Sequence, residues 1–255
     1  LWSRGLGDVY KRQDVTEPCS IVLMQTLARD AVEDCLSRGV IPFLVGGSAL
    51  YTKAILDEMS IPPTDPQVRA RWQERLDAQG PHALHDELAR RDPKAAESIL
   101  PGNGRRIVRA LEVIDLTGSF TATIPDGTFH WPNTVQIGLE LPRQDMDQRI
   151  AERVDQMWAD GFVDEVCSLV DAGLRGGLTA SRALGYRQVL EYLDGEYDED
   201  GARRRTVTGT RRFARKQLMW YRRDDRIEWF NALSSDLDDC VMARVLTALS
   251  AGEED

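Results

Sequence analysis

Two kinds of residue in this sequence could bind a ligand that carries phosphate: paired glycines after an apolar run, and clusters of arginine. In FLVGGSALYTKAILD, residues 43–57, the apolar run leads into Gly46, Gly47 and Ser48 and then into an amphipathic stretch. Such a turn faces the carboxyl end of a strand, where bare backbone and a helix N-terminus can hold an anion. No P-loop lysine follows the glycines. A plain strand-to-helix turn that needs small residues is the alternative.

The densest positive charge lies in residues 202–223, which carry eight arginines, one lysine and no acid in a chain of net charge −10. At about 100° per residue, one helix would present two cationic stripes. The first stripe comprises Arg204, Arg211, Arg215 and Arg222. The second comprises Arg205, Arg212, Lys216 and Arg223. On the opposite side we expect a packed arc, comprising Val207, Phe213, Ala214, Leu218, Trp220 and Tyr221.

This charge has three interpretations. The arginines could pair with the many acids of the chain, they could bind a phosphate backbone, or the helix could lie on a membrane surface. We favour phosphate, because like charges spaced four residues apart repel and need an anionic partner. The acidic balance of the whole chain argues against a general nucleic-acid coat protein.

Two further clusters favour the same ligand. Arg105, Arg106 and Arg109 fall in the first turns of a predicted helix, where cations oppose the helix dipole; pairing with Glu97 or Asp115 is the alternative. In SRALGYRQ, residues 181–188, arginines flank a glycine beside an aromatic residue. That arrangement could hold a splayed base and its phosphate, as readers of single-stranded RNA do.

Little else in the composition indicates a site. The four cysteines lie far apart, which is typical of reduced thiols in the cytoplasm. His82 and His85 are interpreted as part of a solvated helix face, so no metal ligand is predicted. No apolar run is long enough to span a membrane, and no signal peptide is recognised.

The elements that must position these residues are three short strands among many helices. Strands are predicted at 40–45, 134–141 and 226–230. Helices are predicted at 20–39, 48–58, 66–79, 81–91, 103–117, 145–160, 161–170 and 202–223. The pattern predicts an α/β fold, in which helices flank a parallel sheet and a helical insertion interrupts it.

The chain is expected to divide into four parts. Residues 14–60 and 133–235 would form the α/β core, 61–132 the helical insertion, and 236–255 a C-terminal helix with an acidic tail. Residues 1–13 fit no element and are interpreted as non-native.

Five segments together resemble one family. LVGGSALYTKAIL, DPQVRARW, RRIVRALEV, ASRALGYRQVL and TRRFARKQLMWYRR occur in the order and at the spacing of the tRNA dimethylallyltransferases, also called tRNA isopentenyltransferases, over about residues 14–232. The resemblance implies transfer of a dimethylallyl group from dimethylallyl pyrophosphate to N6 of an adenine beside the anticodon. It also implies a P-loop kinase-like core with an inserted helical domain, and we expect a monomer.

The resemblance implies tRNA contacts within the basic segments, near the glycine turn of Gly46 and Gly47. The implied tRNA-binding residues are Ser48, Arg69, Arg105, Arg106, Arg109, Arg182, Gly185, Tyr186, Arg187, Arg215, Lys216, Gln217, Trp220 and Arg222. Ser48 stands where the family usually has threonine, and either hydroxyl can form the same hydrogen bonds. We expect the arginine-bearing stretches to converge with the turn on one groove.

One departure from the family is large. The P-loop that would hold pyrophosphate and Mg²⁺, and the aspartate expected to act on the adenine amine, would stand upstream of Asp14. We therefore predict no catalytic residue in this chain and expect it to be inactive as given. A non-catalytic RNA-binding module and a small-molecule kinase of the P-loop superfamily are the alternative functions.

Overall fold

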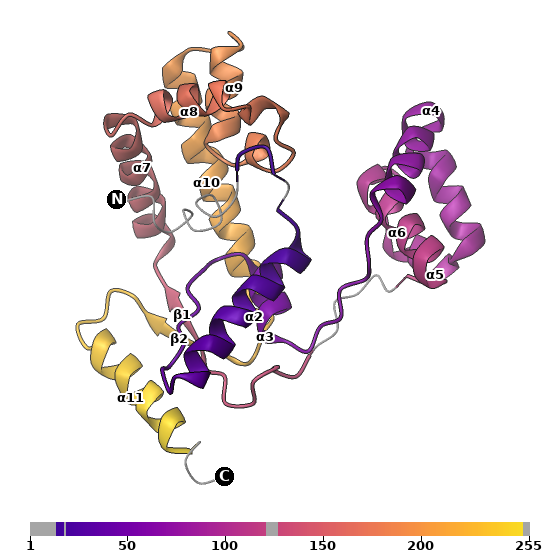
Figure 1. The fold of residues 1–255 in the computed structure, drawn as a ribbon. Coiled ribbons are helices and arrows are strands. Elements are labelled where there is room, and N and C mark those ends of the chain that lie inside the picture. Colours follow the sequence, from indigo (N-terminus) through magenta and orange to yellow (C-terminus); the bar gives the residue numbers. More distant parts are fainter. Residues whose placement is uncertain (1–13, 18, 121–126, 252–255) are drawn as a thin grey trace. The chain divides into compact units, whose positions relative to one another are not determined.

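A computed structural model of the chain describes residues 14–17, 19–120 and 127–251 (Figure 1). The segment 1–13 interpreted as non-native lies outside them. The chain divides into two compact units. The second unit is Asp57–Thr128, and the first contains the residues before and after it.

The first unit contains a parallel pair of strands, β1 (Gln136–Glu140) and β2 (Ile227–Asn231). Both strands were predicted, and their parallel pairing among helices confirms the α/β class. Gly138 of β1 lies opposite Trp229 of β2. A Cβ atom at Gly138 would lie 2.5 Å from the Trp229 ring, so the indole occupies the space that a side chain would need.

The predicted strand at 40–45 is wrong. This run follows helix α2 (Ile21–Ser37) and precedes helix α3 (Ala49–Leu56), and it forms no strand in the described structure. Its side chains are open to solvent, with Phe43 77% and Val45 92% exposed. A central strand exists only through hydrogen bonds to neighbouring strands. Within the described residues, β1 and β2 pair only with each other.

Helices make up the rest of the first unit. They are α7 (Arg143–Ala159), α8 (Phe162–Asp171), α9 (Tyr186–Leu193), α10 (Glu199–Tyr221) and α11 (Leu237–Ala251). Helix α10 runs beside α7 and α9 and also contacts α3, while α11 contacts β2 (Figure 1). A buried cluster joins α8 and α9, comprising Phe162, Val166, Leu174, Ala180, Val189 and Leu190.

The described part of the second unit is helical. Helix α4 (Pro66–Arg91) covers both helices predicted at 66–79 and 81–91, which meet at a kink where Gly80 has φ 79°. Helices α5 (Pro93–Ser98) and α6 (Gly104–Thr117) follow. Helix α6 matches the helix predicted at 103–117; it begins at the Asn103 cap and ends at Gly118, which adopts the left-handed conformation. The core contains Trp72, Leu84, Leu88, Ile99, Ile107, Val108, Ala110, Leu111 and Ile114.

The close approach at Gly138 yields a test. We expect Gly138→Ala to destabilise the first unit by about 1–3 kcal/mol, because the new methyl group must displace the Trp229 indole. Urea denaturation followed by tryptophan fluorescence measures the change. Gly176→Ala is the matched control, since a Cβ atom there meets nothing within 4 Å. Equal stability of the two variants would contradict the packing described here.

Candidate nucleic-acid interface

The first cationic stripe of α10 is largely neutralised within the protein. Arg222 pairs with Glu140, and Arg204 lies 3.7 Å from a carboxylate oxygen of Asp198. The Arg211 guanidinium donates to the carbonyl oxygen of Asp147 at 2.8 Å and lies 3.7 Å from its carboxylate. Pairing with acids therefore explains three of the four arginines in this stripe.

The second stripe is not neutralised in this way. The Arg205 guanidinium lies 4.5 Å from the centre of the Tyr197 ring. Further along the chain, four more exposed cations make no ion pair with any described residue, namely Arg212, Arg215, Lys216 and Arg223. Unbalanced positive charge is therefore concentrated in the C-terminal half of α10 and just beyond it.

Large apolar side chains lie among these cations. Phe213 is 48% exposed, Trp220 40% and Met219 62%. The prediction that Phe213 and Trp220 lie on a packed side is wrong, because the neighbouring helices cover the arc of Ala214, Leu218 and Tyr221 instead. The exposed residues form one surface, here called the open face of α10, comprising Arg212, Phe213, Arg215, Lys216, Met219, Trp220 and Arg223.

The glycine turn borders the open face on one side. The Gln217 side-chain amide donates a hydrogen bond to the carbonyl oxygen of Gly47. A Cβ atom at Gly47 would lie 2.7 Å from that amide nitrogen, so a side chain there would displace the end of Gln217. A Cβ atom at Gly46 would meet nothing within 4 Å. Ser48 is partly buried.

A second contact joins the same two helices. The hydroxyl groups of Thr52 in α3 and Tyr221 in α10 lie 2.8 Å apart. Burial raises the pKa of Tyr221, and the Thr52 hydrogen bond opposes this shift. The tyrosine therefore stays protonated, and its hydrogen bond with Thr52 holds α3 against the side of α10.

A cavity of about 530 Å³ borders the open face on the other side. It lies at the carboxyl ends of β1 and β2, beside the first turns of α7, and its cationic lining residues are Arg143, Arg215 and Arg222. Arg222 is paired with Glu140, and Arg143 lies 3.9 Å from Asp147. Arg215 is thus the cation of this group that has no ion pair among the described residues.

The glycine turn and the cavity lie on different sides of α10, and convergence of the arginine-bearing stretches on one groove stays a prediction. At about 100° per residue, Arg215 and Gln217 project from different sides of α10. Gln217 contacts the turn, whereas Arg215 and Arg222 line the cavity beside α7. The open face therefore lies between the turn and the cavity.

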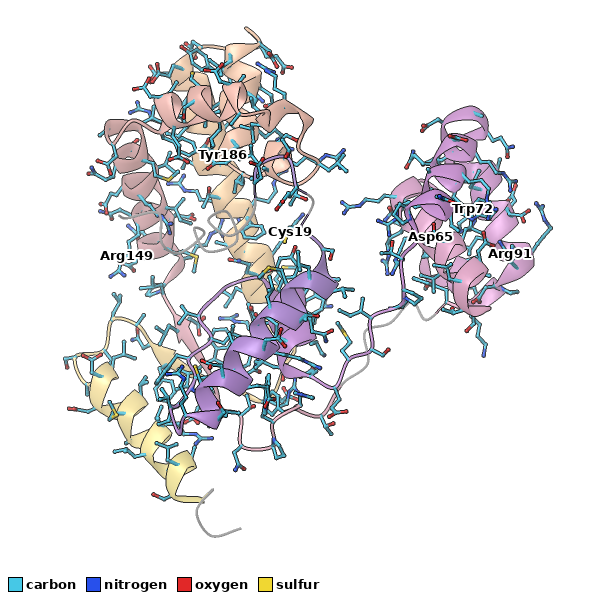
Figure 2. All side chains as sticks on the ribbon, viewed as in Figure 1. Cys19, Asp65, Trp72, Arg91, Arg149 and Tyr186 are labelled. Carbon is cyan, nitrogen blue, oxygen red and sulfur yellow. The ribbon has the colours of Figure 1, made fainter. Side chains whose placement is uncertain are left out.

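The segment around Gly185 and Tyr186 has a clear structural role. Gly185 adopts φ 97° and is the N-cap residue of α9. Its backbone amide donates to the Gln188 side chain at 2.8 Å. The Tyr186 ring stacks on Phe162, and its hydroxyl donates to Glu165 at 2.6 Å; the residue lies among α8 and α9 (Figure 2). RNA contact at these two residues stays a prediction.

The arginines that flank this segment are solvent-exposed. Arg187 lies 3.5 Å from Glu191 in the next turn of α9, and no ion pair is recorded for Arg182 with a described residue. Their side chains are accessible to a ligand, and the predicted contacts with RNA are untested.

In the second unit, two predicted RNA-binding arginines contact one buried carboxylate. Glu112 accepts hydrogen bonds from Arg69 at 2.7 and 3.0 Å and from Arg109 at 2.9 Å. The partner of Arg109 is therefore Glu112, and neither Glu97 nor Asp115 as considered from the sequence. Glu112 was not predicted as a functional residue, and the one signal for it is an acid on the apolar side of helix 103–117.

Asp115 belongs to a different group. It accepts from the Trp72 indole N–H at 2.7 Å and pairs with Arg71 and Arg91; Trp72 and Arg91 are seen in Figure 2. Of the remaining predicted arginines, Arg105 and Arg106 are exposed, and the backbone amide of Arg106 donates to the Asn103 cap.

No group of three or more His, Cys, Asp or Glu side chains within the described residues is arranged to hold a metal ion. None of the helices described combines the length and apolar character that crossing a membrane requires.

Comparison with known proteins identifies relatives of the chain. The family model described as IPP transferase matches residues 9–224. The tRNA dimethylallyltransferase of Cutibacterium acnes is 86% identical over 95% of this chain and 76% of its own length. That of Thermobifida fusca is 54% identical over 91% of this chain and 73% of its own. The crystal structure of the Bacillus halodurans tRNA isopentenylpyrophosphate transferase superposes with a TM-score of 0.64 at 34% identity, covering 95% of this chain and 78% of that one.

The charge network of the second unit predicts a dependence on pH. Burial alone would raise the pKa of Glu112, but hydrogen bonds from Thr64, Arg109 and Arg69 outweigh burial and lower it below the ordinary 4.5. A lowered carboxylate pKa stabilises the fold above the ordinary value, and this stabilisation is lost as the pH falls through the folded-state value.

We therefore expect the amides of α6 to lose hydrogen-exchange protection as the pH falls below about 4.5. Rates corrected for intrinsic exchange between pH 7 and pH 3 provide the measurement. Glu112→Gln is the reference variant, because it cannot ionise and should show a weaker dependence. Identical pH profiles for both proteins would contradict the assignment to Glu112.

Proposed function

The chain belongs to the IPP transferase family, and we propose that it provides the tRNA-holding surface of an enzyme that transfers a dimethylallyl group to tRNA. The acceptor is N6 of an adenine next to the anticodon, and the donor is dimethylallyl pyrophosphate. The observation that carries the proposal is the open face of α10, where four cations that form no ion pair with a described residue lie among three exposed apolar side chains.

This surface suits the single-stranded loop of an anticodon stem-loop. Arginine and lysine bind backbone phosphates and release counterions, so the cations would follow the RNA backbone. Exposed aromatic rings such as Phe213 and Trp220 provide platforms on which unpaired bases stack. A double helix offers no unstacked bases, so the mixture of charge and aromatic surface favours a loop.

The transfer itself needs groups that act on the donor. Negative charge develops on the leaving pyrophosphate, and cationic or metal groups would stabilise it, for which Mg²⁺ is the proposed cofactor. The described residues offer no metal-binding group, so we assign them no step through Mg²⁺. What they provide is binding and orientation of the RNA. We further propose that the protein acts in the cytoplasm and as a monomer.

The open face leads to a prediction about salt dependence. We expect Arg215→Ala to weaken binding of an anticodon stem-loop and to lower the slope of log affinity against log salt by about one, because one phosphate contact is lost. Fluorescence anisotropy over 50–300 mM KCl (about a sixfold range) measures both quantities.

Arg203→Ala is the matched control on the same helix, since Arg203 pairs internally with Asp155 and Asp200. Its slope should equal that of the unsubstituted protein. The same slope for Arg215→Ala would show that Arg215 makes no phosphate contact.

A transfer assay separates the proposed enzyme from its rivals. Full-length protein incubated with labelled dimethylallyl pyrophosphate and an anticodon stem-loop should place the label on one adenine, which nuclease digestion and mass spectrometry would locate. RNA binding without transfer would indicate a non-catalytic RNA-binding module. Nucleotide binding that is indifferent to RNA would indicate a small-molecule kinase.

A further inference from the structure

A buried carboxylate in the second unit links two arginines to the segment that precedes α4. The Glu112 side chain is fully buried. One of its oxygens accepts from Arg69 and Arg109. The other accepts from the Thr64 hydroxyl at 2.6 Å and from the Asp65 backbone amide at 3.0 Å. A buried carboxylate needs such a complete set of donors, so its position is closely determined.

The two arginines use their guanidinium groups differently. Arg109 is 27% exposed and also donates to the carbonyl oxygens of Pro62 and Pro63, at 2.8 and 3.0 Å. Most of its donors are thus satisfied within the unit. Arg69 is 49% exposed and donates to Glu112 through Nε and one terminal nitrogen, Nη2. Its other terminal nitrogen, Nη1, has no partner among the described residues.

Two guanidinium groups share the single buried carboxylate of Glu112, and Arg69 is the more exposed of the two cations. A guanidinium that is already held on one edge loses little conformational freedom when its other edge binds an anion. Planar donors fixed in this way match a phosphate oxygen well.

We propose that Glu112 is a positioning residue, which fixes the Arg69 guanidinium so that its free edge binds a phosphate of the RNA. Arg109, by contrast, serves mainly to hold the chain at Pro62 and Pro63 against α6. This inference rests on the proposed function, because it takes the RNA of that proposal as the ligand. It divides the two predicted RNA-binding arginines into one that contacts RNA and one that acts within the fold.

Glu112→Gln tests the proposal, because the amide keeps the shape of the side chain and removes the charge. The NH₂ group of the glutamine must replace one of the two carboxylate oxygens. It then faces N–H or O–H groups that had donated to that oxygen, either those of the two guanidinium groups or those of Thr64 and Asp65. We expect this variant to weaken binding of an anticodon stem-loop by roughly tenfold, the effect of one lost oriented charged hydrogen bond. Glu97→Gln, at an exposed position of α5 with no described partner, should bind like the unsubstituted protein.

A double-mutant cycle separates positioning from folding. If Glu112 acts through Arg69, adding Glu112→Gln to Arg69→Ala should weaken binding by no more than about twofold beyond Arg69→Ala alone. An equal effect of Glu112→Gln with and without Arg69 would overturn the proposal, because the carboxylate would then act through general stability. A thermal unfolding curve for each variant confirms that a folded protein is compared.

Arg69→Lys provides a second variant that leaves Glu112 in place. Lysine keeps the charge but cannot hold the carboxylate on one edge and present a second edge, so we expect binding nearly as weak as for Arg69→Ala. Binding equal to that of the unsubstituted protein would overturn the positioning role. If Arg215→Ala weakens binding while the Arg69 and Glu112 variants do not, the proposed function stands and the positioning role falls. Absence of RNA binding by the unsubstituted protein overturns both.

Discussion

Repulsion between the like charges of α10 is the constraint on which the structure of the first unit depends. Cations spaced three or four residues apart destabilise a helix by about 0.2–0.5 kcal/mol per pair. Towards its N-terminus, α10 meets this cost with acids: Asp198 and Asp200 in its own first turns, and Asp155 on α7. Beyond Arg211 such pairing is sparse among the described residues. The uncompensated repulsion there is tolerable if an anionic ligand relieves it.

Local signals allowed most of the described helices to be predicted. The Ser20 cap of α2, the Asn103 cap of α6 and the Gly118 stop each depend on a few neighbouring residues, and they bound helices that were predicted at 20–39 and 103–117. The prediction of a strand at 40–45 failed because a buried strand depends on partners far along the chain. The packed side of α10 was also partly wrong, since a helical wheel shows which side chains share a face and not whether another element covers it.

The candidate site could likewise be predicted only in part. The sequence identified the basic segments, but it could not separate cations available to a ligand from those that hold the fold together. Arg109 and Arg215 look alike in the sequence, yet Arg109 is bound to Glu112 and two carbonyl groups, whereas Arg215 is exposed and forms no ion pair within the described part of the chain. That distinction depends on where a buried acid lies in three dimensions.

The exposed run at residues 40–45 has a consequence for the behaviour of the protein in solution. Phe43 and Val45 present apolar side chains in a segment that forms no strand in the described structure, so its backbone has no sheet partner there. Such a segment can pair with a strand of another molecule, and the associated fraction of the protein rises with its concentration. Pro42 opposes this association, because it withholds one backbone N–H from any ladder that would form.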